Sequence, residues 1–244
     1  MKAEIITIGD ELLIGQVVDT NSAWMAQRLN EAGIELYQIT SVHDNREHIL
    51  SALDEAFSRA DIVLTTGGLG PTKDDITKHV MCEYFGTTLV EDSRVREHIH
   101  ELYKERPDVL NRLTATQWLV PESAKILTNR VGSAPIMVFQ KEIDYQPKTL
   151  IAMPGVPHEM KIAMTEQVMP FLEFRERSQG ELQNGGRAAY SLEAGSIIHR
   201  TILLSGIAES TLAILIEDWE NALPTTMHLA YLPKDGIIRL RLST

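Results

Sequence analysis

Two kinds of apolar pattern alternate along the first 174 residues of the chain. Short β-branched runs predict buried strands, and apolar residues recurring every three to four positions predict amphipathic helices. The predicted strands cover residues 3–8, 34–40, 61–66, 136–140 and 148–153. The predicted helices cover residues 23–32, 74–85, 92–104, 108–119 and 158–174, and one more helix carries Ile49, Leu53, Ala56 and Phe57 on its apolar face. This alternation favours an α/β fold, a three-layer sandwich with a mostly parallel sheet between helices.

Capping patterns predict where two of these helices begin. Asn21 and Ser22 are placed to cap the helix at 23–32. Asp44 precedes the next helix, and Glu47 follows three residues later, which is the pattern of a capping box. Both patterns therefore interpret these polar residues as helix caps.

A change of composition marks a second, smaller domain. Residues 175–187 are rich in charged residues, Gly, Ser and Asn, which predicts a flexible linker between a domain at 1–174 and one at 188–244. The second domain carries strand patterns at 197–204, 228–231 and 237–242 and a helix pattern at 209–222. Such a small α+β unit is marginally stable alone, so we expect it to pack on the first domain or on another subunit.

Composition and charge exclude several classes of protein. The chain of 244 residues is 43% apolar and 23% charged, which is ordinary for a globular protein. A net charge of −11 without a basic stripe argues against a nucleic-acid partner. The single cysteine, Cys82, excludes an internal disulfide. Neither a signal-peptide pattern nor an apolar run of about 20 residues is present, so we expect a cytoplasmic protein without a membrane partner.

The candidate chemistry begins in the segment that follows the predicted strand at 61–66. This segment contains Gly67, Gly68 and Gly70, then Thr72, Lys73, Asp74 and Asp75. Glycines let the backbone approach a ligand closely, and a helix N-terminus favours a phosphate. Carboxylates suit a hard cation such as Mg²⁺. The segment is neither a P-loop nor a Gly-x-Gly-x-x-Gly motif, but it predicts a metal–phosphate site.

Two further segments follow predicted strands and should reach the same edge of the sheet, where ligands of such folds bind. Residues 9–22 contain Asp10, Glu11 and Asn21, and residues 154–159 contain Gly155, Pro157, His158 and Glu159. Each has a structural interpretation beside the functional one. Glu11 or Asp10 either joins a metal shell or lies on a surface loop, and Asn21 either caps a helix or binds substrate. Asp75 either completes a Thr72-x-x-Asp75 cap or holds the metal.

The motifs together resemble the N-terminal part of the CinA family (competence/damage-inducible protein), which is similar to the molybdopterin-binding domains of molybdenum-cofactor biosynthesis proteins. The matching segments are residues 9–16, 19–21, 66–75, 131–135 and 154–161. The tail resembles the small KH-like domain of CinA proteins, although a Gly-x-x-Gly clamp for RNA is lacking. Asp10 stands where the family usually has a small hydroxyl residue, Ile136 where glycine is usual and His158 where serine is common.

The resemblance implies a pyrophosphatase that depends on a divalent metal, Mg²⁺, Mn²⁺ or Co²⁺. Its substrate would be ADP-ribose or a similar nucleotide diphosphate, cleaved to AMP and ribose 5-phosphate. Glu11, Asp75 and Asp74 would hold the metal, and Lys73 would act with Asp75 and Glu11 in catalysis. The implied substrate and phosphate contacts are Gly67, Gly68, Gly70, Thr72, Asn21, Gly155, Pro157 and Glu159.

Two other functions fit the same motifs. One is molybdopterin binding or adenylyl transfer, and the other is a non-catalytic nucleotide sensor. The resemblance also implies a homo-oligomer, most simply a dimer. Many CinA proteins carry a C-terminal nicotinamide-nucleotide amidase, and since this chain ends at Thr244 we do not expect that activity from it.

Overall fold

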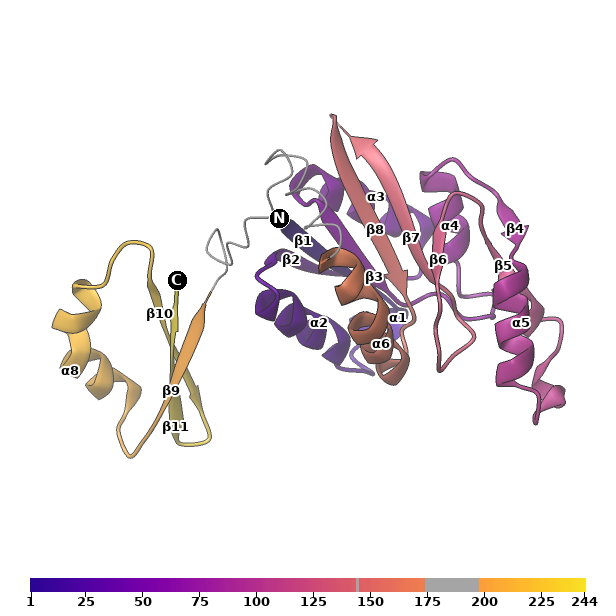
Figure 1. Cartoon of the computed structure of the whole chain (residues 1–244). Helices are drawn as coiled ribbons and strands as arrows, with labels where there is room; N and C mark the ends of the chain where they lie inside the picture. The colour runs from indigo at the N-terminus through magenta and orange to yellow at the C-terminus, as the bar shows by residue number, and fades with distance from the viewer. Residues whose placement is uncertain (144, 174–197) are drawn as a thin grey trace. The chain divides into compact units, whose positions relative to one another are not determined.

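The computed structural model describes residues 1–143, 145–173 and 198–244 (Figure 1). The chain divides into two compact units, residues 1–190 and 191–244. The predicted linker at 175–187 lies outside the described residues, as do residue 174 and the start of the predicted second domain at 188–197. Each unit is described by itself.

The first unit is built on a six-stranded sheet with the order β2-β1-β3-β8-β7-β6. Its strands are β1 (Lys2–Ile8), β2 (Glu35–Val42), β3 (Ile62–Thr66), β6 (Lys125–Leu127), β7 (Ile136–Ile143) and β8 (Gln146–Met153). The pairs β1–β2, β1–β3 and β3–β8 are parallel, and β7 joins β8 as an antiparallel hairpin partner. The predicted mostly parallel sheet is therefore confirmed.

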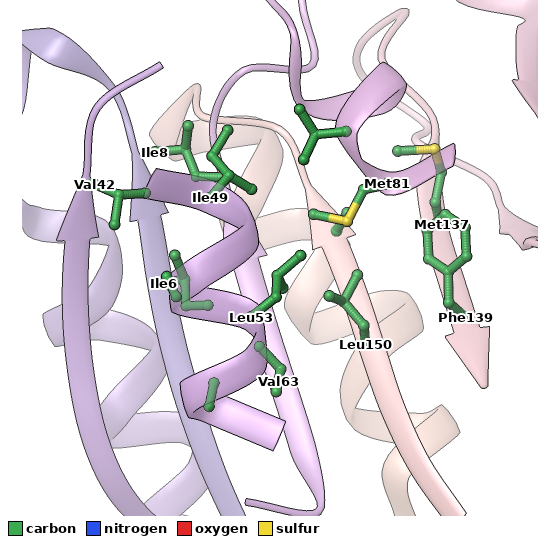
Figure 2. Close-up of a cluster of buried hydrophobic side chains, with 14 of the residues drawn as sticks. Ile6, Ile8, Val42, Ile49, Leu53, Val63, Met81, Met137, Phe139 and Leu150 are labelled. Atoms are coloured by element: carbon green, nitrogen blue, oxygen red, sulfur yellow. The ribbon is translucent and has the colours of Figure 1, made fainter. Parts of the chain in front are cut away.

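Helices cover both faces of this sheet, as Figure 1 shows. On one face α2 (Thr20–Glu31) and α6 (Pro157–Ala163) bury Met25, Leu29 and Met160 against strand residues such as Ile5. On the other face α3 (Arg46–Arg59) and α4 (Thr77–Tyr84) form the core drawn in Figure 2, which includes Ile6, Leu53, Met81 and Phe139. Ile5 and Ile6 point to opposite cores because side chains alternate along a strand.

The remaining elements of this unit are short or peripheral. They are α1 (Asp10–Leu13), β4 (Leu89–Glu91), α5 (Ser93–Leu102), β5 (Leu119–Pro121) and three further turns of helix: two 3₁₀ segments, Pro107–Val109 and Thr114–Trp118, and a π-helical turn, Met164–Val168. β4 and β5 pair antiparallel as a separate two-stranded sheet. Asp92 caps α5 by accepting hydrogen bonds from the N–H groups of Arg94 and Val95.

Four sequence predictions about helices are wrong in detail. The helix predicted at 108–119 is replaced by the two 3₁₀ segments, because Asn111 and Thr114 bond to nearby backbone instead. The helix predicted to start at residue 74 starts at Thr77. The caps differ too: Asp19 caps α2 rather than the residues after it, and Asn45 caps α3 in place of Asp44.

The second unit is a three-stranded antiparallel sheet with one helix. Its elements are β9 (His199–Ser205), α8 (Glu209–Asn221), β10 (His228–Lys234) and β11 (Ile237–Ser243), with the sheet order β10-β11-β9. Leu212 from the helix packs on Ile238 and Leu240 of the central strand. The α+β pattern predicted for the tail is present. Among the described residues, no helix is long and apolar enough to cross a membrane.

Candidate functional site: a pocket at the carboxyl ends of three strands

A pocket of about 520 Å³ opens where β1, β3 and β8 end. Its volume lies within the range of small-molecule sites. It brings together nine residues predicted from sequence: Glu11, Asn21, Gly67, Gly68, Gly70, Asp74, Asp75, Gly155 and Pro157. Three other predicted residues, Thr72, Lys73 and Glu159, do not line it. The expected convergence of three strand-ending segments is therefore observed.

The glycine segment can sit against the sheet only because it lacks side chains. Gly67 has φ +113, and a Cβ there would lie 1.9 Å from the carbonyl oxygen of Ile8. Gly68 has φ +63, and a Cβ there would lie 2.1 Å from Oγ1 of Thr77. Both positions combine a left-handed backbone with a close neighbour, so any larger residue would move the loop away from the strand ends.

Asp75 organises this loop from the inside. Its Oδ1 accepts a hydrogen bond from the N–H of Gly70 at 2.8 Å, and its Oδ2 accepts from the N–H of Thr72 at 3.0 Å and from the Thr72 hydroxyl. These bonds hold the backbone in a turn, which is why α4 begins only at Thr77. A carboxylate has about four acceptor positions, so Asp75 keeps one for a ligand. The predicted helix cap by Asp75 is wrong, because the N-cap of α4 is Ile76 and receives no side-chain hydrogen bond, while Asp75 stabilises the turn before it. The metal contact of Asp75 stays a prediction.

Asp44 is a pocket residue that the sequence prediction missed. Its Oδ2 accepts a hydrogen bond from the N–H of Asp10 at 3.2 Å, and it lines the pocket beside Gly68. Burial raises the pKa of the Asp44 carboxyl; the N–H of Asp10 opposes this rise, and the negative charges of Asp10, Glu11 and Asp75 add to it. Its position after a strand that ends at the same sheet edge could have identified Asp44 as a pocket residue. The capping-box pattern led us to interpret it as a helix cap instead.

The acidic side chains around the pocket fit a cation that is shared with phosphate. Asp10, Glu11 and Asp75 are close enough to Asp44 to raise its pKa by repulsion, a cost that a divalent cation would relieve. Within the described residues, no three His, Cys, Asp or Glu side chains are arranged to hold a metal ion alone. Mg²⁺ commonly uses one or two carboxylates, with waters and substrate phosphates completing its shell. The donor set therefore fits a metal–phosphate site rather than a closed protein cage.

Asn21 joins two walls of the pocket. Its Nδ2 donates to the carbonyl oxygen of Gly155 at 2.7 Å and to Oγ1 of Thr66 at 3.4 Å. The Thr66 hydroxyl in turn donates to the carbonyl oxygen of Pro154 at 2.7 Å. Because Asp19 accepts the capping hydrogen bond from Ser22, the Asn21 side chain is available for this bridge. The first turn of α2 is thereby tied to the turn after β8.

The predicted residues outside the pocket have other surroundings. Lys73 is exposed on the loop, and Glu159 accepts a hydrogen bond from Asn129 at 2.8 Å while packing on Gly132. Lys78, which the sequence prediction passed over, is the buried cation near the loop. Its Nζ donates to the carbonyl oxygen of Thr116 at 3.0 Å, and burial lowers its pKa to about 8.

Comparison with known proteins places this chain in a family. A family model described as a probable molybdopterin binding domain matches residues 4–173. A CinA-like protein of Flavobacterium psychrophilum is 44% identical, with all of this chain and 54% of that protein covered. A putative competence-damage inducible protein of Clostridium beijerinckii is 37% identical, with the same coverage of both chains. The chain thus spans about half the length of these curated relatives.

A solved structure agrees with the sequence relatives. The protein CinA of Thermoplasma acidophilum, whose function is described as unknown, matches with a TM-score of 0.62 and 30% identity. The match covers 69% of this chain and 96% of that one. The resemblance seen in the glycine segment and the two neighbouring motifs is therefore confirmed across fold and sequence. The chain belongs to the family of CinA-like proteins.

Proposed function

We propose that this protein hydrolyses the pyrophosphate bond of ADP-ribose or a related nucleotide diphosphate with the help of a divalent metal, giving AMP and ribose 5-phosphate. The observation that carries the proposal is the pocket itself, in which a glycine turn and several carboxylates meet at one sheet edge. In the reaction a water oxygen bonds to one phosphorus, and the bridging oxygen leaves with the other phosphate.

The glycine turn supplies the phosphate contacts in this proposal. Gly67 and Gly70 already donate their N–H groups, to the Met153 carbonyl and to Asp75 respectively. The N–H groups of Gly68 and Leu69 donate to no partner among the residues that the structure describes. Both residues line the pocket, so their N–H groups are the ones we assign to a phosphate oxygen. Gly67 and Gly70 then act by shaping the turn.

The carboxylates supply the metal contacts. Glu11 lies over Gly9, so close that a Cβ on Gly9 would be 2.5 Å from its Oε1, and Asp44 and Asp74 line the same pocket. Together with the one free acceptor position of Asp75, they could hold Mg²⁺, Mn²⁺ or Co²⁺. When bound, such an ion neutralises phosphate charge and lowers the pKa of a water. Lys73 is exposed on the same loop, and we assign it to a substrate phosphate.

The test is AMP release from ADP-ribose with each of the three metals, followed by Glu11→Gln. Glutamine keeps the size of Glu11 but removes its charge, so we expect turnover to fall at least about 100-fold with an unchanged melting temperature. Glu97→Gln is the matched control, because Glu97 is exposed on α5 and outside the pocket. Full activity of Glu11→Gln would remove Glu11 from the metal shell, and no AMP release with any metal would refute the hydrolysis.

A second function, molybdopterin binding or adenylyl transfer, is favoured by the description of the matching family model. Molybdopterin and a nucleotide diphosphate both carry phosphate, so the same glycine turn would bind either ligand. Purification of the protein with a bound fluorescent pterin would support this function over hydrolysis. Tight ADP-ribose binding without turnover would instead support a nucleotide sensor.

We also propose that the protein acts as a homodimer in the cytoplasm on a small nucleotide and without a nucleic-acid partner. The second unit leaves Ile202, Leu203, Ile214 and Leu215 between 61% and 75% exposed. We assign exposed apolar side chains of this unit to the dimer interface. Analytical ultracentrifugation tests this, since a monomer at micromolar concentration would contradict it.

A further inference from the structure

The pocket has two chemically different sides, and the proposed hydrolysis uses only one. Asp44 and the turn that leads into α4 lie on the side of the sheet covered by α3 and α4. On the side covered by α2 and α6, the lining has the polar residues Asp19, Thr20 and Asn21 and an apolar wall of Val17, Val18, Val156 and Pro157. The proposed metal and phosphate contacts do not use the three valines of this wall.

The three valines of this wall are unusually exposed for apolar side chains. Val18 is 81% exposed, and Val17 and Val156 are each 53% exposed. They come from two different segments, the stretch before α2 and the turn before α6. Apolar side chains that gather at a pocket, outside either core cluster, favour a ligand with an apolar surface.

The backbone holds these valines in place before any ligand arrives. The N–H groups of Gln16 and Val17 both donate to the carbonyl oxygen of Glu11, at 3.0 and 3.2 Å. The bond from Asn21 to the carbonyl of Gly155 fixes the second segment relative to the first. Valine also has a restricted χ1 torsion. Binding an apolar group here would therefore order few new torsions, which favours affinity.

We infer that Val17, Val18 and Val156 form the subsite for the purine base of a nucleoside diphosphate whose phosphates lie at Gly68 and Leu69. The inference rests on the proposed function for the position of the phosphates. A pocket of about 520 Å³ has room for a nucleotide as well as a diphosphate. Since valine side chains offer no hydrogen bonds, they contact the faces of the base and not its edges. The valines themselves then do not distinguish adenine from guanine.

Equilibrium binding of AMP and of ribose 5-phosphate, both with Mg²⁺, separates the base from the sugar and phosphate. The variants are Val18→Asn and Val156→Asn in the whole chain, and the control is Val90→Asn, because Val90 is an exposed valine on β4 outside the pocket. We expect each pocket variant to weaken AMP binding about three- to tenfold and to leave ribose 5-phosphate binding unchanged.

Several outcomes would overturn the subsite. They are unchanged AMP affinity in both pocket variants, or equal weakening for AMP and ribose 5-phosphate. A change in sedimentation with unchanged AMP affinity would assign the valines to contact between copies instead. Because the measurement is binding, it does not depend on turnover. If ADP-ribose is not cleaved but the variants lose AMP affinity, the hydrolysis fails and the subsite stands. If ADP-ribose is cleaved and its KM is the same in both pocket variants as in the wild type, the hydrolysis stands and the subsite fails.

Discussion

Two glycines have nearly the same left-handed backbone conformation but different surroundings, so substitutions at them distinguish backbone strain from a steric clash. Gly68 has φ +63 and Gly86 has φ +62, but a Cβ on Gly68 would meet Thr77 at 2.1 Å whereas one on Gly86 would meet nothing within 4 Å. Gly86→Ala should cost about 1 kcal/mol from the backbone alone, and Gly68→Ala about 2–4 kcal/mol together with most of the activity. Chemical denaturation measures both. Equal costs would show that the loop moves freely away from α4.

Asp44 illustrates a residue whose ionisation opposes folding. Burial raises its pKa above the ordinary value of 3.8, so the folded state holds the proton more tightly than the unfolded state. As pH rises from about 4 through the folded pKa, ionisation therefore lowers stability, and above that pKa the cost stays constant. Asp44→Asn removes this cost while its side-chain oxygen can still accept from Asp10.

We expect Asp44→Asn to melt about 1–2 °C higher than the wild type at pH 7, to melt equally at pH 3 to 4, and to lose turnover. Melting temperatures across that pH range, beside an assay of AMP release, check both parts. Asp74→Asn is the control for the melting temperatures alone, since Asp74 is an exposed carboxylate of the same pocket. A variant that is less stable at every pH would show that Asp44 contributes chiefly through its hydrogen bond.

At the scale of the element, α3 carries two arginines in different surroundings. Arg59 donates to Glu4, a residue of β1 that is only 1% exposed, with Nε to Oε1 at 2.7 Å. Arg46 pairs with Glu83 on the surface, where both side chains are nearly half exposed. Arg59→Met would leave a buried carboxylate without its charged partner.

Arg59→Met should therefore lower the free energy of unfolding by about 2–4 kcal/mol, and Arg46→Met by at most about 1 kcal/mol. Urea unfolding of the two variants makes a direct comparison within one helix. Since burial of Glu4 drives the difference, Glu4→Gln in the Arg59→Met background should recover part of the loss. Similar losses in the two single variants would contradict the argument.

At the scale of the whole molecule, all residues of the candidate site belong to the first unit. The pocket uses residues between Thr7 and Pro157, and the Thermoplasma acidophilum CinA structure is covered over 96% of its length by 69% of this chain. A chain ending after residue 190 should therefore keep AMP release from ADP-ribose within about threefold of the full chain. A loss above tenfold, with the truncated chain still folded by circular dichroism, would show that residues 191–244 contribute to the site.

The sequence by itself determined the class of fold and the edge of the sheet at which the site lies. Apolar runs such as that of β1 and the helical spacing of Ile49, Leu53 and Phe57 report burial, which is the dominant favourable term in folding. Glycine clusters after strands report turns. Both patterns depend only on residues that are close in sequence, so they can be recognised without knowing the tertiary structure.

Only the tertiary structure decided which polar residues reach the pocket. Asp44 and Asn21 have the local pattern of helix caps, but Asn45 and Asp19 take those bonds and leave the other two to contacts 34 and 134 positions away, with Asp10 and Gly155. In the same way Glu159, expected near substrate, bonds to Asn129 across the fold. Neighbouring polar residues compete for one cap almost equally, and long-range contacts settle which of them wins.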